Sequence, residues 1–161
     1  MNKFNSVWKR RKQLKTDYRK RLILLKGKTP RLVIRLSNNF INLQYIVHNS
    51  KGDISKLNIL SKSLREIGWK KTLRSLPVCY LTGYLFGVKA KEKKLDLEMI
   101  VDLGMQSAFP KGRLFAAIKG AVDAGVKLKV EEKMFPSEDR IKGKHIKLEK
   151  EFETILSKIK K

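Results

Sequence analysis

The sequence predicts a two-layer α/β domain with a mixed sheet, preceded by a basic N-terminal arm and followed by a C-terminal helical tail. Three observations support this. Alternating apolar residues mark three strands in the first half of the chain, helical patterns follow in the order β-β-β-α-β-α, and positive charge is concentrated at the start. We therefore divide the chain into an arm at 1–29, a globular core at 30–128 and a tail at 129–161.

The arm is expected to contain one short helix. Thr16 can cap its first turn, Asp17 places a negative charge at its N-terminal end, and Gly27 ends it. The preceding residues are polar and basic apart from Trp8, so we predict an extended segment that becomes ordered on binding a partner.

The strands are predicted from apolar residues at every second position. In the first strand, Leu32 and Ile34 point to one side while Arg31 and Arg35 point to the other. The three segments are 31–36, 40–47 and 54–60. Turn residues separate them, so we expect an antiparallel meander with one polar, partly basic face.

Helical segments and a fourth strand follow the meander. The central helix is expected to be capped by Ser75, and Gly83 and Gly87 are expected to seat it against the sheet. The predicted elements are a short helix at 61–67, the central helix at 76–93, a strand at 97–103 and a helix at 113–124. The last helix is amphipathic, with an apolar face of Leu148, Phe152, Ile155 and Ile159.

The charge distribution indicates a polyanionic partner. The 161 residues carry a net charge of +23, and residues 1–30 alone hold 11 Lys and Arg against one acidic residue. Solubility needs only about 2–8 net charges, so nucleic acid is the first candidate partner and an anionic membrane the second. No membrane binding is expected, because Arg11 and Arg21 interrupt or flank the apolar stripe of the arm and the longest uncharged stretch is short.

Enzymatic signals are weak. The chain has one cysteine, Cys79, and two histidines, His48 and His145, at unrelated places, so we expect no metal site and no cofactor. The alternative function is a Mg²⁺-dependent RNA nuclease that uses Asp96, Glu98 and Asp102 on one face of the fourth strand. We favour the ordinary explanation of a solvated or salt-bridged strand face, since alternation alone brings such acids together.

RNA is the polyanion that the residue types suit best. Lys and Arg neutralise phosphates, and Trp8 and Tyr18 among those cations can stack on unpaired bases. Arg31 and Arg35, with Gln44 on the next strand, form a second positive surface. Duplex DNA, or a chromatin protein with a nuclear import signal at residues 9–12, is the remaining alternative, although no known DNA-binding motif is present.

Short strings along the chain resemble one known family. They include Lys15-Thr16-Asp17-Tyr18-Arg19, Pro30-Arg31-Leu32-Val33, Tyr80-Leu81-Thr82-Gly83, Asp102-Leu103-Gly104, Lys111-Gly112-Arg113, Asp123-Ala124-Gly125 and Phe135-Pro136 with Arg140-Ile141. In this order, over roughly residues 9–146, they resemble the archaeal and eukaryotic branch of the universal large-subunit ribosomal protein family eighteen. The chain length is closer to that of archaeal members.

The resemblance implies a non-catalytic protein of the large ribosomal subunit, in the cytoplasm, that binds 5S rRNA and anchors it in the central protuberance. Its implied partners are 5S rRNA, large-subunit rRNA and the large-subunit ribosomal protein five family, with no homo-oligomer. The RNA contacts that it implies, or that the arm itself suggests, are Trp8, Lys9, Arg10, Arg11, Lys12, Lys15, Tyr18, Arg19, Arg21, Arg31, Arg35, Asn38 and Gln44, with Thr82, Lys111 and Arg113 at helix starts.

Overall fold

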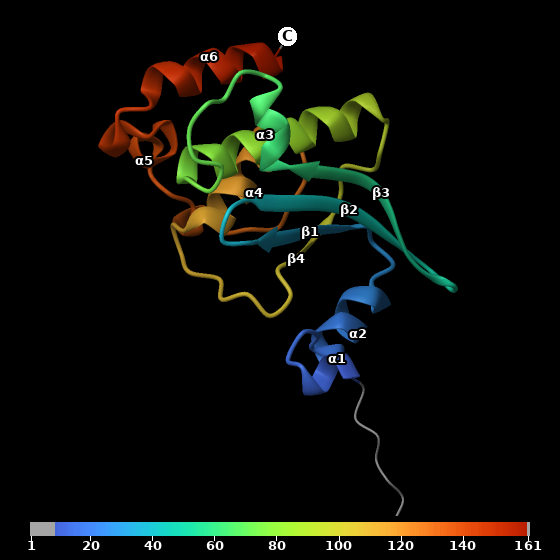
Figure 1. Ribbon diagram of the computed structural model, residues 1–161. Coiled ribbons are helices and arrows are strands. Elements are labelled where there is room, and N and C mark those ends of the chain that lie inside the picture. The colour runs from blue at the N-terminus through green and yellow to red at the C-terminus, as the bar shows by residue number, and fades with distance from the viewer. Residues whose placement is uncertain (1–8, 161) are drawn as a thin grey trace, which may run out of the picture.

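The computed structural model describes residues 9–160 (Figure 1). Its helices are α1 (Lys9–Lys12), α2 (Tyr18–Lys26), α3 (Leu76–Glu92), α4 (Arg113–Asp123), α5 (Glu138–Lys142) and α6 (Glu149–Lys160). Its strands are β1 (Arg31–Leu36), β2 (Ile41–Asn49), β3 (Gly52–Leu60) and β4 (Ile100–Asp102). Three 3₁₀ helices are η1 (Ser61–Arg65), η2 (Glu132–Met134) and η3 (Lys144–Ile146).

The four strands form one mixed sheet in the order β3-β2-β1-β4. β1 pairs antiparallel with β2, β2 pairs antiparallel with β3, and β4 joins the other edge of β1 in parallel. The predicted mixed sheet and the element order are therefore confirmed. The parallel pair requires a crossover, which α3 provides.

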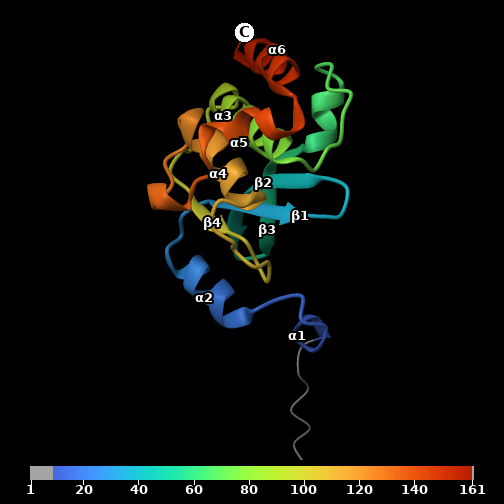
Figure 2. The same ribbon diagram turned by 90° about the vertical axis from the view of Figure 1, so that its left-hand side faces the viewer.

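Helices α3 and α4 cover one face of the sheet, while α1 and α2 lie on the other side (Figures 1 and 2). The covered face presents Leu32 and Ile34 of β1 and Leu43 of β2, all fully buried in the main core. The register places Arg31, Val33 and Arg35 on the opposite face, as alternation requires.

The predicted close approach at Gly83 and Gly87 occurs, but the neighbour of α3 there is helix α4 and not the sheet. A Cβ atom at Gly83 would overlap the carbonyl oxygen of Ala117 in α4, and one at Gly87 would collide with the Cβ atom of Ala124. Small residues therefore allow close approach of the α3 and α4 backbones, as GxxxG pairs do elsewhere.

Three predictions need correction at the N-terminal end. The residues before Thr16 were expected to be extended, but Lys9–Lys12 form the helix α1. The N-cap of α2 is Asp17, whose Oδ1 accepts hydrogen bonds from the N–H groups of Arg19 and Lys20, and Thr16 lies one residue too early. The second face of β1 was expected to be polar and partly basic, but it is largely buried, with Arg31 and Val33 only 1% and 5% exposed.

The C-terminal tail packs onto the core. Phe152, Ile155 and Ile159, on the predicted apolar face of α6, are buried, and the Phe152 ring lies 5.7 Å from that of Tyr80 in α3. Within residues 9–160, no helix has the length and apolar character needed to cross a membrane.

Candidate nucleic-acid interface

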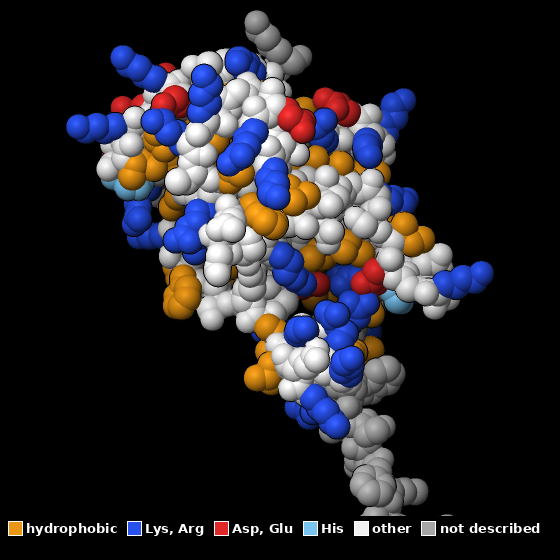
Figure 3. Space-filling model, viewed as in Figure 1, with side chains coloured by type: hydrophobic (Ala, Val, Ile, Leu, Met, Phe, Trp, Pro, Cys, Tyr) orange, Lys and Arg blue, Asp and Glu red, His pale blue; other side chains and the backbone are white. Residues whose placement is uncertain are grey.

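The arm presents a cluster of exposed cations. All four residues of α1 are basic and exposed, namely Lys9, Arg10, Arg11 and Lys12. The α1–α2 connection is held by a hydrogen bond of 2.9 Å from Arg10 Nε to Thr16 Oγ1. Figure 3 shows Lys and Arg side chains gathered over α1, α2 and the adjoining end of the sheet. Trp8 lies outside the described residues.

Helix α2 continues the cationic surface without forming an apolar core of its own. Lys15 and Arg19 are exposed, and Tyr18 is partly buried at the start of the helix. No residue of α2 is buried, and Leu22 and Ile23 are 57% and 69% exposed. Apolar packing therefore contributes little to holding this helix against the sheet.

An ion-pair network holds the arm instead. Arg21 Nη2 of α2 lies 2.7 Å from Asp53 Oδ2 in β3, and Arg31 Nη2 of β1 lies 2.7 Å from the same oxygen. Arg31 Nη1 and Arg35 Nη2 each lie 3.2 Å from a carboxylate oxygen of Asp102 in β4. The network thus connects α2 with three strands of the sheet.

The network determines the ionisation of Asp53. Burial by itself would raise the pKa of this carboxyl, but the bonds from Arg31, Arg21 and His48 outweigh it and lower the pKa to about 2. The carboxylate consequently stays charged at neutral pH and keeps both guanidinium groups in place.

Arg31, which was predicted to be part of a second positive surface and to contact RNA, does not reach the surface. Its side chain is 2% exposed and lies between Asp53 and Asp102. A buried cation needs paired charges, and both carboxylates supply them. Arg35 is different: its side chain is 43% exposed while its Nη1 donates a hydrogen bond of 2.8 Å to the Asp102 carbonyl.

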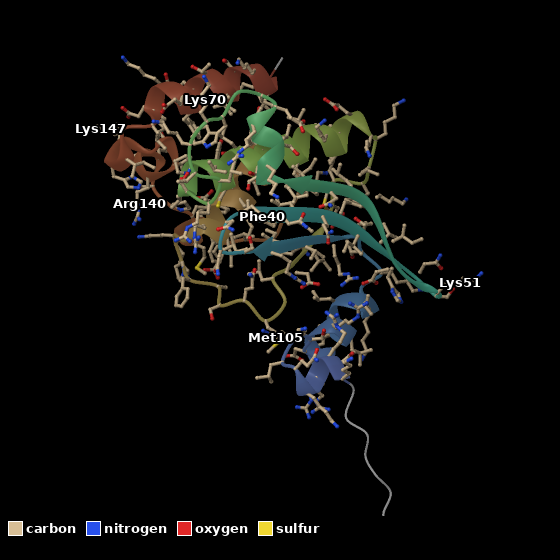
Figure 4. All side chains as sticks on the ribbon, viewed as in Figure 1. Phe40, Lys51, Lys70, Met105, Arg140 and Lys147 are labelled. Carbon is tan, nitrogen blue, oxygen red and sulfur yellow. The ribbon has the colours of Figure 1, made fainter. Side chains whose placement is uncertain are left out.

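A cavity of about 660 Å³ separates the arm from the segment 101–108. Five cations line it, namely Arg10, Lys15, Lys20, Arg21 and Arg35. Asp17 and Asp102 also line it, but both carboxylates accept hydrogen bonds from their surroundings. Met105, 52% exposed, lies beside the arm (Figure 4). Lys20 was not among the predicted RNA contacts. Its position between Arg19 and Arg21 in the sequence could have indicated that it belongs to the same basic surface.

The remaining predicted contacts are scattered. Gln44 is partly exposed on the same sheet face as Arg35, opposite Val33 in the register. Asn38 is exposed in the β1–β2 turn, and Lys111 and Arg113 are exposed at the start of α4. Gln44, Asn38, Lys111 and Arg113 do not line the cavity beside the arm.

Thr82 was predicted to contact RNA at a helix start, but the structure does not place it at one. It lies inside α3, is fully buried, and its Oγ1 donates a hydrogen bond of 2.7 Å to the Val78 carbonyl. α3 begins at Leu76, so Thr82 lies in its second turn, and the side chain of Thr82 faces the core.

The three acidic residues that the alternative nuclease function requires do not form one cluster. β4 begins only at Ile100, so Asp96 and Glu98 lie outside the strand that carries Asp102. Asp96 Oδ1 accepts a hydrogen bond from the Glu98 N–H, whereas Asp102 binds two arginines. Across residues 9–160, no three His, Cys, Asp or Glu side chains are grouped to hold a metal ion.

The sequence is similar to proteins of the large ribosomal subunit. Residues 2–99 match the family described as "Ribosomal large subunit proteins 60S L5, and 50S L18". Three similar archaeal proteins are each named "Large ribosomal subunit protein uL18". That of Korarchaeum cryptofilum is 40% identical over 144 residues, which cover 89% of this chain and 73% of the relative.

The other two relatives match this chain with similar identity and coverage. The protein of Methanoculleus marisnigri is 43% identical over 86% of this chain and 79% of its own length. That of Haloquadratum walsbyi is 41% identical over 86% of this chain and 67% of its own length. With matches of this extent, the chain belongs to the uL18 family of large ribosomal subunit proteins, which are structural and not enzymatic.

Proposed function

We propose that this chain binds 5S rRNA through its basic arm and the adjoining sheet face, and anchors that RNA in the central protuberance of the large subunit. The observation that carries the proposal is the cationic arm fixed to the sheet by Asp53, with exposed cations on α1 and around the 660 Å³ cavity. Unpaired Lys and Arg side chains bind phosphates and release counterions.

The acids near the arm do not cancel this charge. Asp53 and Asp102 are engaged by Arg21, Arg31 and Arg35. Within residues 9–160, no carboxylate pairs with α1 or Lys15. Phosphate contacts of this kind fix the position of an RNA without reading its sequence. Selectivity for 5S rRNA would then come from its shape and from side chains such as Gln44 and Tyr18.

The same proposal includes two neighbours implied by family membership. Large-subunit rRNA would contact other surfaces of the domain, and a protein of the large-subunit ribosomal protein five family would lie beside it. The chain would act as a single copy.

The proposal is tested by measuring 5S rRNA binding over a range of salt concentrations. The variant R10Q/R11Q/K12Q removes three arm cations, and K89Q/K127Q/K150Q removes three exposed cations elsewhere. The arm variant should reduce the slope of log K against log salt by about 2–3, since each phosphate contact contributes about 0.9. Equal slopes for the two variants would contradict the role of the arm, and weak binding of wild type to 5S rRNA would contradict the function.

A further inference from the structure

The outer edge of β4 is covered only at its start. On the inner edge, the Ile100 N–H donates a hydrogen bond of 2.9 Å to the carbonyl of Pro30, just before β1. On the outer edge, Lys127 belongs to an isolated parallel bridge and accepts a hydrogen bond of 3.3 Å from the Met99 N–H. Within residues 9–160, no strand pairs with this edge beyond the bridge. Since backbone groups alternate between the two edges of a strand, the N–H and C=O of Val101 point to the open part.

A groove of about 340 Å³ lies beside this open edge. Six of its eight lining residues are apolar, and the full lining is Val101, Leu103, Phe115, Ile118, Lys129, Val130, Glu131 and Met134. Ligand clefts in proteins have volumes of about 300–1,000 Å³, so an apolar side chain can enter a groove of this size. A mainly apolar lining suits a protein segment and not a phosphate backbone.

Lys129 gives the groove a cation that a partner can pair with. The other charged lining residue, Glu131, is already paired, with its Oε2 2.6 Å from Lys133 Nζ. Lys129 is exposed, and no carboxylate within residues 9–160 pairs with it. Charge complementarity therefore calls for an acidic side chain in the partner, next to the apolar one that enters the groove.

The loop between β4 and α4, yellow in Figure 1, adds an exposed aromatic side chain. Its first eight residues carry no charge, and Phe109 among them is 73% exposed. The Gln106 side chain bonds the N–H and C=O of Leu36 at 3.1 and 2.8 Å, and the Lys111 N–H donates to the Met134 carbonyl at 2.9 Å. Because Met134 lines the groove, the loop holds Phe109 near it. Exposed aromatic residues in uncharged surroundings are typical of protein interfaces.

We propose that the open edge of β4 and its groove form a protein-binding site for an extended segment of a partner protein. The segment adds a strand to β4 through the backbone of Val101, places an apolar side chain in the groove and an acidic one at Lys129, and contacts Phe109. The groove contains none of the five cations of the arm cavity, so the site is independent of the proposed function.

The probe is a displayed library of random twelve-residue peptides, selected on the full chain in high salt, which screens the basic arm. Enriched peptides are synthesised and titrated against wild type, the groove variant F109S/K129E and the matched control I146S/K150E. The control also replaces one exposed apolar residue and one exposed lysine, and circular dichroism checks that both variants are folded. The groove variant should weaken binding about tenfold, and the control should bind like wild type.

Two features of the peptides test how they bind. The enriched sequences should share an apolar residue close to Asp or Glu, and N-methylation of the peptide backbone should abolish binding at every second position only, as strand pairing requires. Equal binding by the groove variant and the matched control would overturn the proposal, as would N-methylation without this period. A twelve-nucleotide oligouridylate that binds more tightly than the peptides and requires Phe109 and Lys129 would also overturn it, by assigning the groove to RNA.

Discussion

Arg31 in β1 holds Asp53 in β3, with Arg31 Nη2 2.7 Å from Asp53 Oδ2, although β2 lies between the two strands. The β2–β3 hairpin extends beyond the other strands (Figure 1), and Asp53 pairs with His48 near its turn. Arg21 then binds the same oxygen from α2. Because α2 buries no residue, these ionic contacts orient the arm.

Replacing Asp53 by Asn should destabilise the protein. The substitution removes the charge that faces Arg31, which is buried and keeps only Asp102. The substitution also weakens the hydrogen bond that Asp53 Oδ2 accepts from Arg21 Nη2. Hydrogen bonds to charged groups contribute about 1.5–3 kcal/mol, so we expect the free energy of unfolding to fall by about 2 kcal/mol. Urea denaturation followed by circular dichroism measures the change.

The matched control for this experiment is Asp139→Asn. Asp139 also pairs with a cation, Lys144, at 2.7 Å, but both side chains are largely exposed. Exposed pairs contribute little, so the control should leave the urea midpoint unchanged. An Asp53→Asn protein with the wild-type midpoint would show that the Arg31 contact does not stabilise the fold.

The low pKa of Asp53 predicts an acid-sensitive contribution to stability. The folded-state pKa, about 2, lies below the ordinary value of 3.8. The contribution is complete above about pH 4 and is lost as pH falls toward 2, because the unfolded chain takes up the proton first. Since the side chain is 22% exposed and screened, we expect about 1–2 kcal/mol.

The measurement compares wild type with Asp53→Asn at several pH values between 5 and about 2. Other carboxyls titrate in both proteins, so the difference in free energy of unfolding isolates Asp53. That difference should shrink as pH falls. A difference independent of pH would mean that Asp53 is not held in its charged form.

Gly83→Ala should destabilise the α3–α4 interface. The new Cβ atom would overlap the Ala117 carbonyl, a backbone atom that cannot rotate away. Overpacking in a core costs about 1–3 kcal/mol, which outweighs the better helix propensity of alanine. Gly27→Ala is the control, because its Cβ atom would meet atoms only at 3.5 Å or more. Thermal unfolding should separate the two variants, and equal midpoints would contradict the close packing.

Most of the fold was predictable because it depends on local patterns. Alternation located β1–β3, and the predicted apolar positions of α6, namely Phe152, Ile155 and Ile159, are buried. The partner of the glycines in α3 was not predictable, since spacing indicates close approach but not which element approaches. The predicted strand at 97–103 is longer than β4, because the sequence pattern does not show which residues have a neighbouring strand. Only three residues of β4 pair with β1.

The candidate site was predictable where charge alone decides exposure. The four basic residues of α1 are exposed, as expected for a charged segment that is surrounded by solvent. Arg31 was placed wrongly because its partner Asp53 is 22 residues away and belongs to what the sequence indicates is only a turn. Thr82 was placed wrongly because a small hydroxyl can bond its own helix and be buried.

Trp8→Ala should weaken binding to 5S rRNA. Trp8 lies outside the described residues, but the sequence places it directly before the four exposed cations of α1. Stacking on an unpaired base contributes about 1–3 kcal/mol, so the dissociation constant should rise about 5- to 150-fold. Trp8→Phe should restore much of the affinity, because a smaller ring still stacks.

Leu14→Ala, at an arm residue that is 76% exposed, controls for loss of apolar surface and should change the dissociation constant little. If Trp8→Ala and Leu14→Ala bind equally, the ring does not stack, and the affinity of the arm comes from its charges.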